Sequence, residues 1–212
     1  MLKKHKSSCL KTTTARKDSS KQILMAAENI FAERGYRGST ISAIADAVGL
    51  PKANILYYFK TKEKLYKEVI KHLLTLWMQH MNEMTPEIHP RDALPKYIMN
   101  KVRQSQKHPN ASRIFAAEVL HGAKYLRQSL QAELREQFEG TSIVFRAWQN
   151  KGWIDPINPE HLIFMLWSST QAYADHELQI SILMGKEQLE EDDFSEGIKL
   201  ITQVILKGIG VK

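Results

Sequence analysis

The chain has 212 residues, of which 43% are hydrophobic and 25% are charged, and its formal net charge is +7 at pH 7. This length suits one large domain, or a small domain joined to a larger one, and it allows a substantial buried core. No stretch approaches the roughly 18 apolar residues of a membrane span, and a single cysteine, Cys9, excludes an internal disulfide framework. The basic N-terminal segment lacks the apolar region of a signal peptide, so a cytoplasmic protein is expected.

The positive charge is concentrated in the first third of the sequence. Residues 1–71 contain fifteen Lys and Arg against six Asp and Glu, a net charge of +9, whereas residues 72–212 contain fifteen against seventeen, a net charge of −2. This asymmetry favours a basic head that binds a polyanion, attached to a nearly neutral body. The alternative is a lysine-rich segment that only increases solubility.

The N-terminal part begins with a basic segment and continues into a helix. Residues 1–18 contain almost no apolar side chains, which predicts a disordered tail. A helix capped by a serine at position 19 or 20 is expected to run to Arg34, because apolar residues recur every three or four positions. Gly35 and Gly38 are typical of the end of such a helix.

Two short helices and a longer one follow. Thr40 is expected to cap the first of them, which Gly49 closes. Pro51 opens the second, which ends near Phe59, and Lys62 begins the long helix. Three short helices before a long one, with a glycine-containing turn between the second and third, have the outline of a helix-turn-helix.

The third helix has the properties of a recognition helix. Ile55 and Phe59 form a stripe that anchors it to the second helix, and the other side is free to enter a major groove. The outward side chains offer an amide for adenine, apolar groups for a thymine methyl, and hydroxyl and ammonium groups for phosphate. The alternative is an ordinary three-helix bundle with exposed lysines. The candidate DNA-binding residues are Thr40, Lys52, Ala53, Asn54, Leu56, Tyr57, Tyr58 and Lys62.

The remainder of the chain is predicted to be helical as well. After the break TPEIHP, helices are expected at about 92–107, 110–121, 124–150, 159–184 and 192–208. The alternation typical of strands is absent. The chain is therefore predicted to be all-α with about nine helices, divided into a helix-turn-helix domain at 19–65 and a larger domain at 66–212.

The segment AAENIFAERGYRGSTISAIADAVGLPKANILYYFKTKEKLYKEVI resembles the DNA-binding domain of the TetR family of transcriptional regulators. The resemblance implies a homodimer that binds a palindromic DNA operator and releases it when a small ligand fills the body. Two positions depart from the family pattern. Pro51 stands where a Ser or Thr cap is usual, and Leu56 stands where Tyr is frequent, so one base contact is expected to be apolar here.

Two segments of the body, 108–126 and 155–175, resemble a branch of that family that responds to uracil and thymine. The residue chemistry is compatible with such a ligand, because an amide such as that of Gln171 both donates and accepts hydrogen bonds and an indole stacks on flat rings. Asp175 lies along the same side of its helix. The alternative is that these aromatic residues form an ordinary core. The candidate effector-binding residues are Trp77, Ser112, Arg113, Phe115, Trp167, Ser168 and Gln171.

The last two predicted helices carry apolar residues on more than one side. A helix of this kind buries one face in its own core and the other against a partner, which predicts a homodimer formed through these two helices. The alternative is an internal helix pair in a monomer. One stripe of the last helix comprises Phe194, Ile198, Ile201 and Ile205, and a second comprises Leu200, Val204 and Ile209; the preceding helix contributes Leu162, Leu166, Tyr173, Ile180 and Leu183.

No enzymatic machinery is apparent in the sequence. The eight histidines include no pair with the spacing of a helical metal site, and no nucleotide-binding or nucleophile motif occurs. We therefore expect no metal, no cofactor and no catalytic activity, and interpret the chain as a ligand-responsive DNA-binding regulator, most simply a repressor. The alternatives are a TetR-like regulator that responds to another aromatic or hydrophobic ligand, and a helical small-molecule-binding protein whose basic head binds RNA or a membrane surface.

Overall fold

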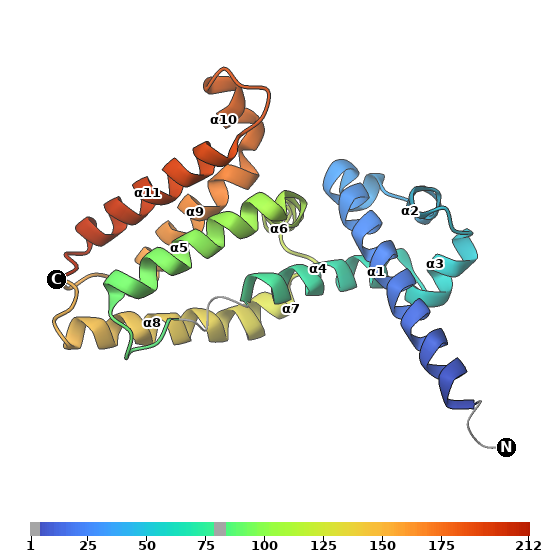
Figure 1. Cartoon of the computed structure of the whole chain (residues 1–212), viewed down its shortest axis with the longest axis horizontal. Coiled ribbons are helices and arrows are strands. Elements are labelled where there is room, and N and C mark those ends of the chain that lie inside the picture. Colours follow the sequence, from blue (N-terminus) through green and yellow to red (C-terminus); the bar gives the residue numbers. More distant parts are fainter. Residues whose placement is uncertain (1–4, 79–83) are drawn as a thin grey trace. The chain divides into compact units, whose positions relative to one another are not determined.

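The computed structural model of the chain describes residues 5–78 and 84–212 (Figure 1), and every regular element in them is a helix. The prediction of an all-α protein is confirmed. The chain forms two compact units, unit 1 (Met1–His72) and unit 2 (Leu73–Lys212), and the boundary between them lies inside a helix, as does the predicted boundary after residue 65. Within the described ranges, no helix is both long enough and apolar enough to cross a membrane.

Helix α1 (His5–Gly38) differs from its prediction at the N-terminal end. The helical backbone starts at His5, whereas the sequence predicts a disordered tail as far as residue 18. No glycine or proline occurs between His5 and Arg34, and extending an existing helix requires no new nucleation step. The other end agrees with the prediction, because Gly35 has φ 66° and ψ 173° and interrupts the helix there.

The other helices of unit 1 agree closely with their predicted bounds. The Thr40 hydroxyl accepts a hydrogen bond from the Ala43 backbone N–H at 3.1 Å, and Gly49 follows the same helix in the left-handed conformation, with φ 65°. Pro51 precedes the next helix without a side-chain cap. The three helices are α2 (Ile41–Val48), α3 (Lys52–Phe59) and α4 (Lys62–Met78).

The core of unit 1 fixes the orientation of α3. Ile55 is fully buried and Phe59 nearly so, as predicted for the anchoring stripe. Ile44 of α2 is also fully buried, whereas Val48 is half-buried. The opposite side of α3 is consequently turned outward.

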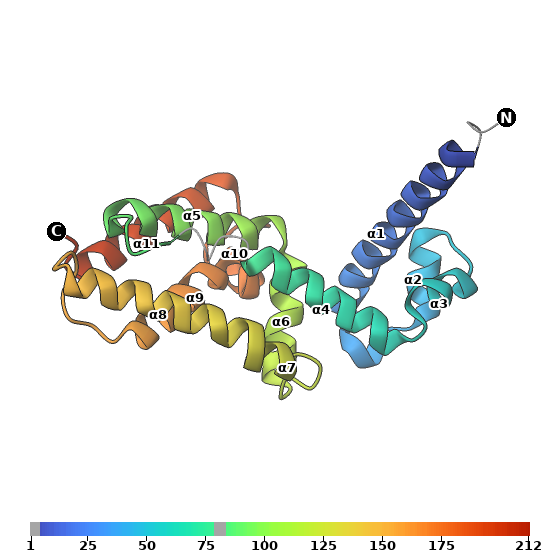
Figure 2. The same cartoon turned by 90° about the horizontal axis from the view of Figure 1, so that it is seen from below.

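Unit 2 is a layered helical bundle (Figures 1 and 2). Helix α5 packs against α9 and α11, and α8 packs against α9. The largest fully buried side chains include Trp148, Phe145, Leu94 and Ile98. The elements are α5 (Pro90–Lys107), α6 (Pro109–Leu120), α7 (Arg127–Ser129), the π-helical turn η2 (Leu130–Leu134), α8 (Arg135–Asn150), α9 (Pro159–Asp175), α10 (Glu177–Leu183) and α11 (Glu191–Gly208).

The prediction of one continuous helix at 159–184 is wrong. The helix is interrupted at His176, which has φ −119° and ψ 22°. The residues on both sides of the interruption are held by α6: the Ser112 hydroxyl donates to the Asp175 carboxylate, and Arg113 forms an ion pair with Glu177. These contacts join residues far apart in the sequence, so local periodicity does not reveal the break.

Gly197 of α11 lies where a side chain would overlap the ring of Tyr173 on α9. Gly197→Leu is expected to lower the free energy of unfolding by about 1–3 kcal/mol, because it overpacks the contact between the two helices. Chemical denaturation at fixed protomer concentration measures this change.

Gly140→Leu is the matched control, because a Cβ at Gly140 of α8 meets no atom within 4 Å. It should preserve or raise stability, since leucine has the higher helix propensity. Adding Tyr173→Ala to Gly197→Leu should restore part of the loss. A Gly197→Leu single variant as stable as Gly140→Leu would contradict the overlap.

Candidate DNA-binding and effector-binding sites

Helix α3 presents most of the predicted DNA-binding side chains to solvent. Lys52, Ala53, Asn54 and Tyr57 are exposed, with Tyr57 58% accessible. The other predicted members are Leu56, Tyr58, Lys62 and the cap residue Thr40; the first three are half-buried and Thr40 is exposed. The arrangement provides an amide, apolar groups and hydroxyls on one short helix, the combination that reads base edges and binds phosphates.

The turn after α3 has an unusual backbone conformation. Lys60 has φ 64° and ψ −51°, and the Thr61 N–H donates to the Phe59 carbonyl at 2.7 Å, which makes this a γ-turn of the strained, positive-φ kind. The Thr61 hydroxyl then accepts a hydrogen bond from the Lys64 N–H at 3.1 Å and caps α4. Exposed lysines at 60 and 64 therefore flank a helix N-terminus, where backbone N–H groups favour anions.

Lys62 has a different position from the one the sequence predicts. Its ammonium group donates to the carbonyls of Tyr36 (2.8 Å) and Ser39 (2.9 Å) and lies 4.3 Å from the centroid of the Tyr36 ring. These contacts tie the start of α4 to the turn between α1 and α2. Lys62 therefore makes contacts within unit 1 that the sequence does not predict, and its phosphate contact stays a prediction.

Unit 2 contains a cavity of about 290 Å³, here called the effector cavity. Four of the predicted effector-binding residues line it together, although they come from α4, α6 and α9: Trp77, Phe115, Trp167 and Gln171. The rings of Trp77 and Phe115 meet edge to face, with centroids 4.4 Å apart. The lining is completed by Lys101, Val119, Leu130 and Leu134, the last two from the π-helical turn.

Three predicted effector-binding residues do not line this cavity. Ser112 is buried and its hydroxyl is bound to Asp175, while Arg113 pairs with Glu177 at 2.8 Å. The exposed Ser168 donates to the carbonyl of Phe164, 2.8 Å away. These hydroxyl and guanidinium groups bind other groups of the protein, and the structure does not bring them together with the four residues that line the cavity.

Lys101 is the functional candidate that the sequence interpretation missed. Its side chain is 4% exposed, and its ammonium group lies 5.3 Å from the centroid of the Trp77 ring. Burial lowers the pKa of Lys101 to about 8, because desolvation disfavours the charged form. The signal was present in the sequence, since Lys101 lies three residues after Ile98 and seven after Leu94 on the buried face of α5.

Trp167 of α9 interacts with a buried tyrosine of α5. Tyr97, buried on α5, has a pKa raised by desolvation, and a side-chain hydrogen bond with Trp167 opposes that rise. An indole can only donate a hydrogen bond, so in this interaction the Trp167 N–H is the donor and the Tyr97 hydroxyl is the acceptor. What Trp167 offers to the effector cavity is therefore chiefly its ring.

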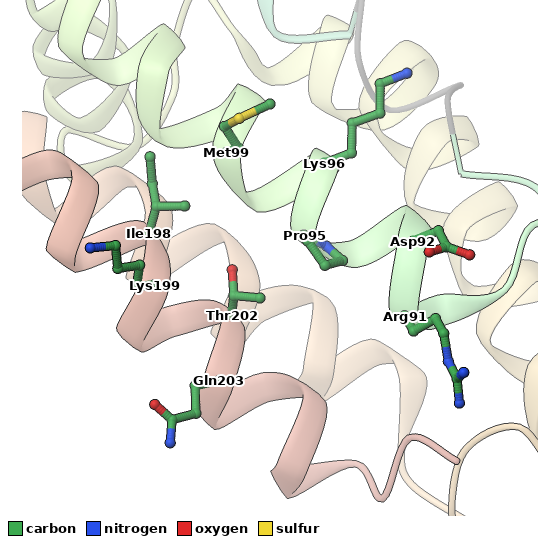
Figure 3. Close-up of a pocket in the computed structure, with 9 residues that line it drawn as sticks. All are labelled: Arg91, Asp92, Pro95, Lys96, Met99, Ile198, Lys199, Thr202 and Gln203. Carbon is green, nitrogen blue, oxygen red and sulfur yellow. The ribbon is translucent and has the colours of Figure 1, made fainter.

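A larger hollow of about 710 Å³ lies between α5 and α11 (Figure 3). Pro95 and Met99 line it on one side, and Ile198 and Thr202 on the other, with lysines at its rim. None of the predicted effector-binding residues lines this groove. Within residues 5–78 and 84–212, no three His, Cys, Asp or Glu side chains gather closely enough to hold a metal ion.

The C-terminal helices expose several large apolar side chains. On α11, Leu200 is 61% and Val204 is 55% exposed, whereas Ile209, expected in the same stripe, is buried. The other stripe of α11 faces inward, with Phe194 and Ile205 buried. Exposed apolar residues in such number mark an interaction surface. We call this set the apolar face: Leu178, Ile182 and Leu183 of α10, with Leu200 and Val204 of α11.

Known proteins share both units. Residues 23–69 match the family described as bacterial regulatory proteins of the tetR family, and residues 70–212 match the C-terminal region of YcdC-like proteins. The HTH-type transcriptional regulator RutR of Escherichia coli K12 is 35% identical over 189 residues, which cover 89% of each chain. The HTH-type transcriptional repressor NicS of Pseudomonas putida is 26% identical over 191 residues, covering 88% of this chain and 90% of that protein.

Solved structures have the same fold. A Clostridium perfringens protein assigned to the regulation of fatty acid metabolism superposes with a TM-score of 0.72 at 25% identity, covering 90% of this chain and all of that one. A TetR-like transcriptional regulator from Rhodococcus superposes with a TM-score of 0.67 at 19% identity, covering 91% and 96% of the two chains.

Proposed function

The chain belongs to the TetR family of transcriptional regulators, and from that membership we propose that it is a homodimeric repressor whose operator binding is relieved by a small effector. Membership makes it a DNA-binding regulator and not an enzyme. The observation that carries the proposal is the effector cavity, which gathers aromatic rings and one amide from separate helices. We place the protein in the cytoplasm, where its operator lies.

The DNA-binding role is assigned to α3 and to the turn that follows it. Asn54 reads adenine, Ala53 and Leu56 contact thymine methyl groups, and the tyrosines bind phosphate. Thr40, Lys52, Lys60 and Lys64 supply further phosphate contacts. The exposure of these side chains supports the assignment. Pro51 and Leu56 depart from the family pattern, so the operator sequence of this protein differs from those of its relatives.

Effector binding is coupled to the operator through α4. This helix begins at Lys62, which is tied to the turn after α1, and carries Trp77 into the effector cavity. An effector that packs against Trp77 favours one position of α4 over another. It shifts the population of DNA-competent dimers only by the difference between its affinities for the two states.

The proposed effector is a pyrimidine base such as uracil or thymine. A cavity of about 290 Å³ is at the small end of ligand sites, which span roughly 300–1,000 Å³. It suits one flat ring between aromatic faces, with Gln171 at its edge. The similarity to RutR, a regulator of pyrimidine utilisation, supports the same choice.

The proposal is tested by measuring thermal unfolding with and without each base. Uracil or thymine at about 100 times its Kd should stabilise the protein by about 2.7 kcal/mol, which raises Tm by several degrees for a chain of this size. The same concentration should release a duplex selected from a random library, measured by fluorescence anisotropy.

Unrelated single-ring aromatic compounds serve as controls for this experiment. A Tm rise with one of those compounds and none with either base would replace the pyrimidine effector with another aromatic ligand. Selection of RNA or anionic vesicles in preference to a palindromic duplex would favour the basic-head alternative instead.

A further inference from the structure

We propose that Lys101 makes the effector cavity select flat rings that turn an oxygen acceptor, and not an amino group, toward its ammonium group. This inference rests on the proposed function, because it requires that the effector bind in this cavity. It adds a specificity-determining residue and the chemical feature of the ligand that this residue recognises.

The first step concerns the surroundings of Lys101. The side chain is 4% exposed, and the cavity that it lines is also lined by Phe115, Val119 and the leucines of the π-helical turn. In the part of the chain that the structure describes, no carboxylate lies within ion-pair distance of this ammonium group. Its neighbour is the face of Trp77, 5.3 Å from the nitrogen to the ring centroid.

The second step is energetic. A buried ammonium group without an anionic partner is destabilising, and a cation–π contact of about 0.5–2 kcal/mol offsets only part of that. A ligand oxygen in the cavity accepts a charge-assisted hydrogen bond, which is about twice as strong as a neutral one. Ligand binding therefore satisfies a group that the empty cavity leaves poorly solvated.

The third step concerns selectivity. An ammonium group has three donors and no acceptor, so an amino group turned toward it leaves donors of both partners unsatisfied. Gln171, the other polar group of the lining, presents either an oxygen or an NH₂ group and adapts to both ligands. The indoles of Trp77 and Trp167 can also only donate, but they are neutral, so a hydrogen bond from either is weaker than one from the ammonium group. Lys101 is thus the charged group in the lining that distinguishes oxo from amino substituents.

The expected consequence is a preference among pyrimidines. Uracil and thymine carry carbonyl oxygens at two ring positions, whereas cytosine has an amino group in place of one of them. An unsatisfied buried donor costs about 1–3 kcal/mol, which corresponds to roughly 5- to 150-fold weaker binding of the amino compound. We expect this ratio between the Kd values of cytosine and uracil.

Isothermal titration of the full-length dimer tests the inference with two matched pairs of ligands. The first pair is uracil and cytosine; the second is 3-pyridazinone and 3-aminopyridazine, an oxo and an amino ring that are not pyrimidine bases. Wild type should prefer the oxo member of each pair. Lys101→Met keeps the length of the side chain without its charge and should remove the preference, and Lys101→Gln should reduce it.

The controls separate this inference from the proposed function. Lys96→Met changes an exposed lysine on the same helix and should retain the wild-type ratios, and circular dichroism shows whether each variant folds. If wild type and Lys101→Met both prefer uracil equally, the inference fails and the pyrimidine effector stands. If wild type binds neither base but prefers 3-pyridazinone in a Lys101-dependent way, the inference stands and the pyrimidine effector fails. Binding of none of the four compounds overturns both.

Discussion

The double substitution Leu200→Glu and Val204→Glu is expected to convert the protein to a monomer and to abolish measurable operator binding. Both side chains belong to the apolar face and are more than half exposed in the single chain, so the folded protomer does not depend on them. In a two-fold symmetric dimer, each substitution places like charges in an apolar interface on both subunits.

The loss of operator binding follows from the loss of symmetry. A palindromic operator is held through two half-sites, and a monomer retains the contacts of only one. Light scattering after gel filtration measures the oligomeric state, and anisotropy with the selected duplex measures affinity, which should fall more than about 100-fold.

Ile143→Glu is the matched control for this experiment. Ile143 of α8 is 61% exposed and apolar, but α8 packs against α9 and does not belong to the pair of helices that carries the apolar face. This variant should remain dimeric and bind DNA normally. If the double variant stays dimeric, α11 does not form the dimer interface. If it is a monomer with unchanged operator affinity, dimerisation is not needed for operator binding.

Asn54→Ala is expected to weaken operator binding strongly without affecting the fold. An amide that pairs with adenine through two hydrogen bonds contributes about 1–3 kcal/mol of discrimination. Each dimer carries two copies, so the loss should be about twice that value for the complete operator. The exposed side chain makes its removal harmless to the core of unit 1.

The informative quantity is the ratio of specific to non-specific affinity. Asn54→Ala should lower affinity for the selected duplex while leaving affinity for random duplex nearly unchanged, because phosphate contacts carry non-specific binding. Lys67→Ala, which alters an exposed ion pair with Glu63 in the same unit, is the control and should change neither. An equal loss on both duplexes would show that Asn54 contacts the backbone and not a base.

The helix-turn-helix could be predicted from sequence because its signals are local. The Thr40 hydroxyl, Gly49 in the left-handed conformation and Pro51 at a helix start each act within a few residues of the end that they define. The family resemblance added the same boundaries independently. Local and tertiary preferences agree in this unit, so the predicted elements are accurate.

Lys62 and the interruption at His176 could not be predicted in the same way. The carbonyls that bind Lys62 lie 23 and 26 residues earlier, and nothing in the run of lysines distinguishes it from Lys60 or Lys64. The break at His176 coincides with contacts to α6, more than 60 residues away. Both features depend on tertiary contacts that a periodic pattern does not encode.

In the effector cavity, the position of each residue around the helix axis decides whether its side chain reaches the cavity. Trp167 and Gln171 are four residues apart and share a face of α9, so both reach the cavity. Ser168 follows Trp167 directly, is turned about 100° around the helix axis, and faces solvent. Lys101 is not predicted as a cavity residue, because the long side chain of a lysine on an apolar stripe usually reaches solvent.

The backbone conformation of Lys60 lowers the stability of the free protein. A glycine adopts positive φ without steric conflict, whereas a lysine in a strained turn costs about 1–3 kcal/mol. An exposed cation at a helix C-terminus recovers roughly 0.3–1 kcal/mol of that. The free protein is therefore expected to be less stable with lysine than with glycine. If Lys60 contacts a phosphate as proposed, that interaction compensates for the cost only in the complex, so the same residue lowers the stability of the free protein and raises the affinity for DNA.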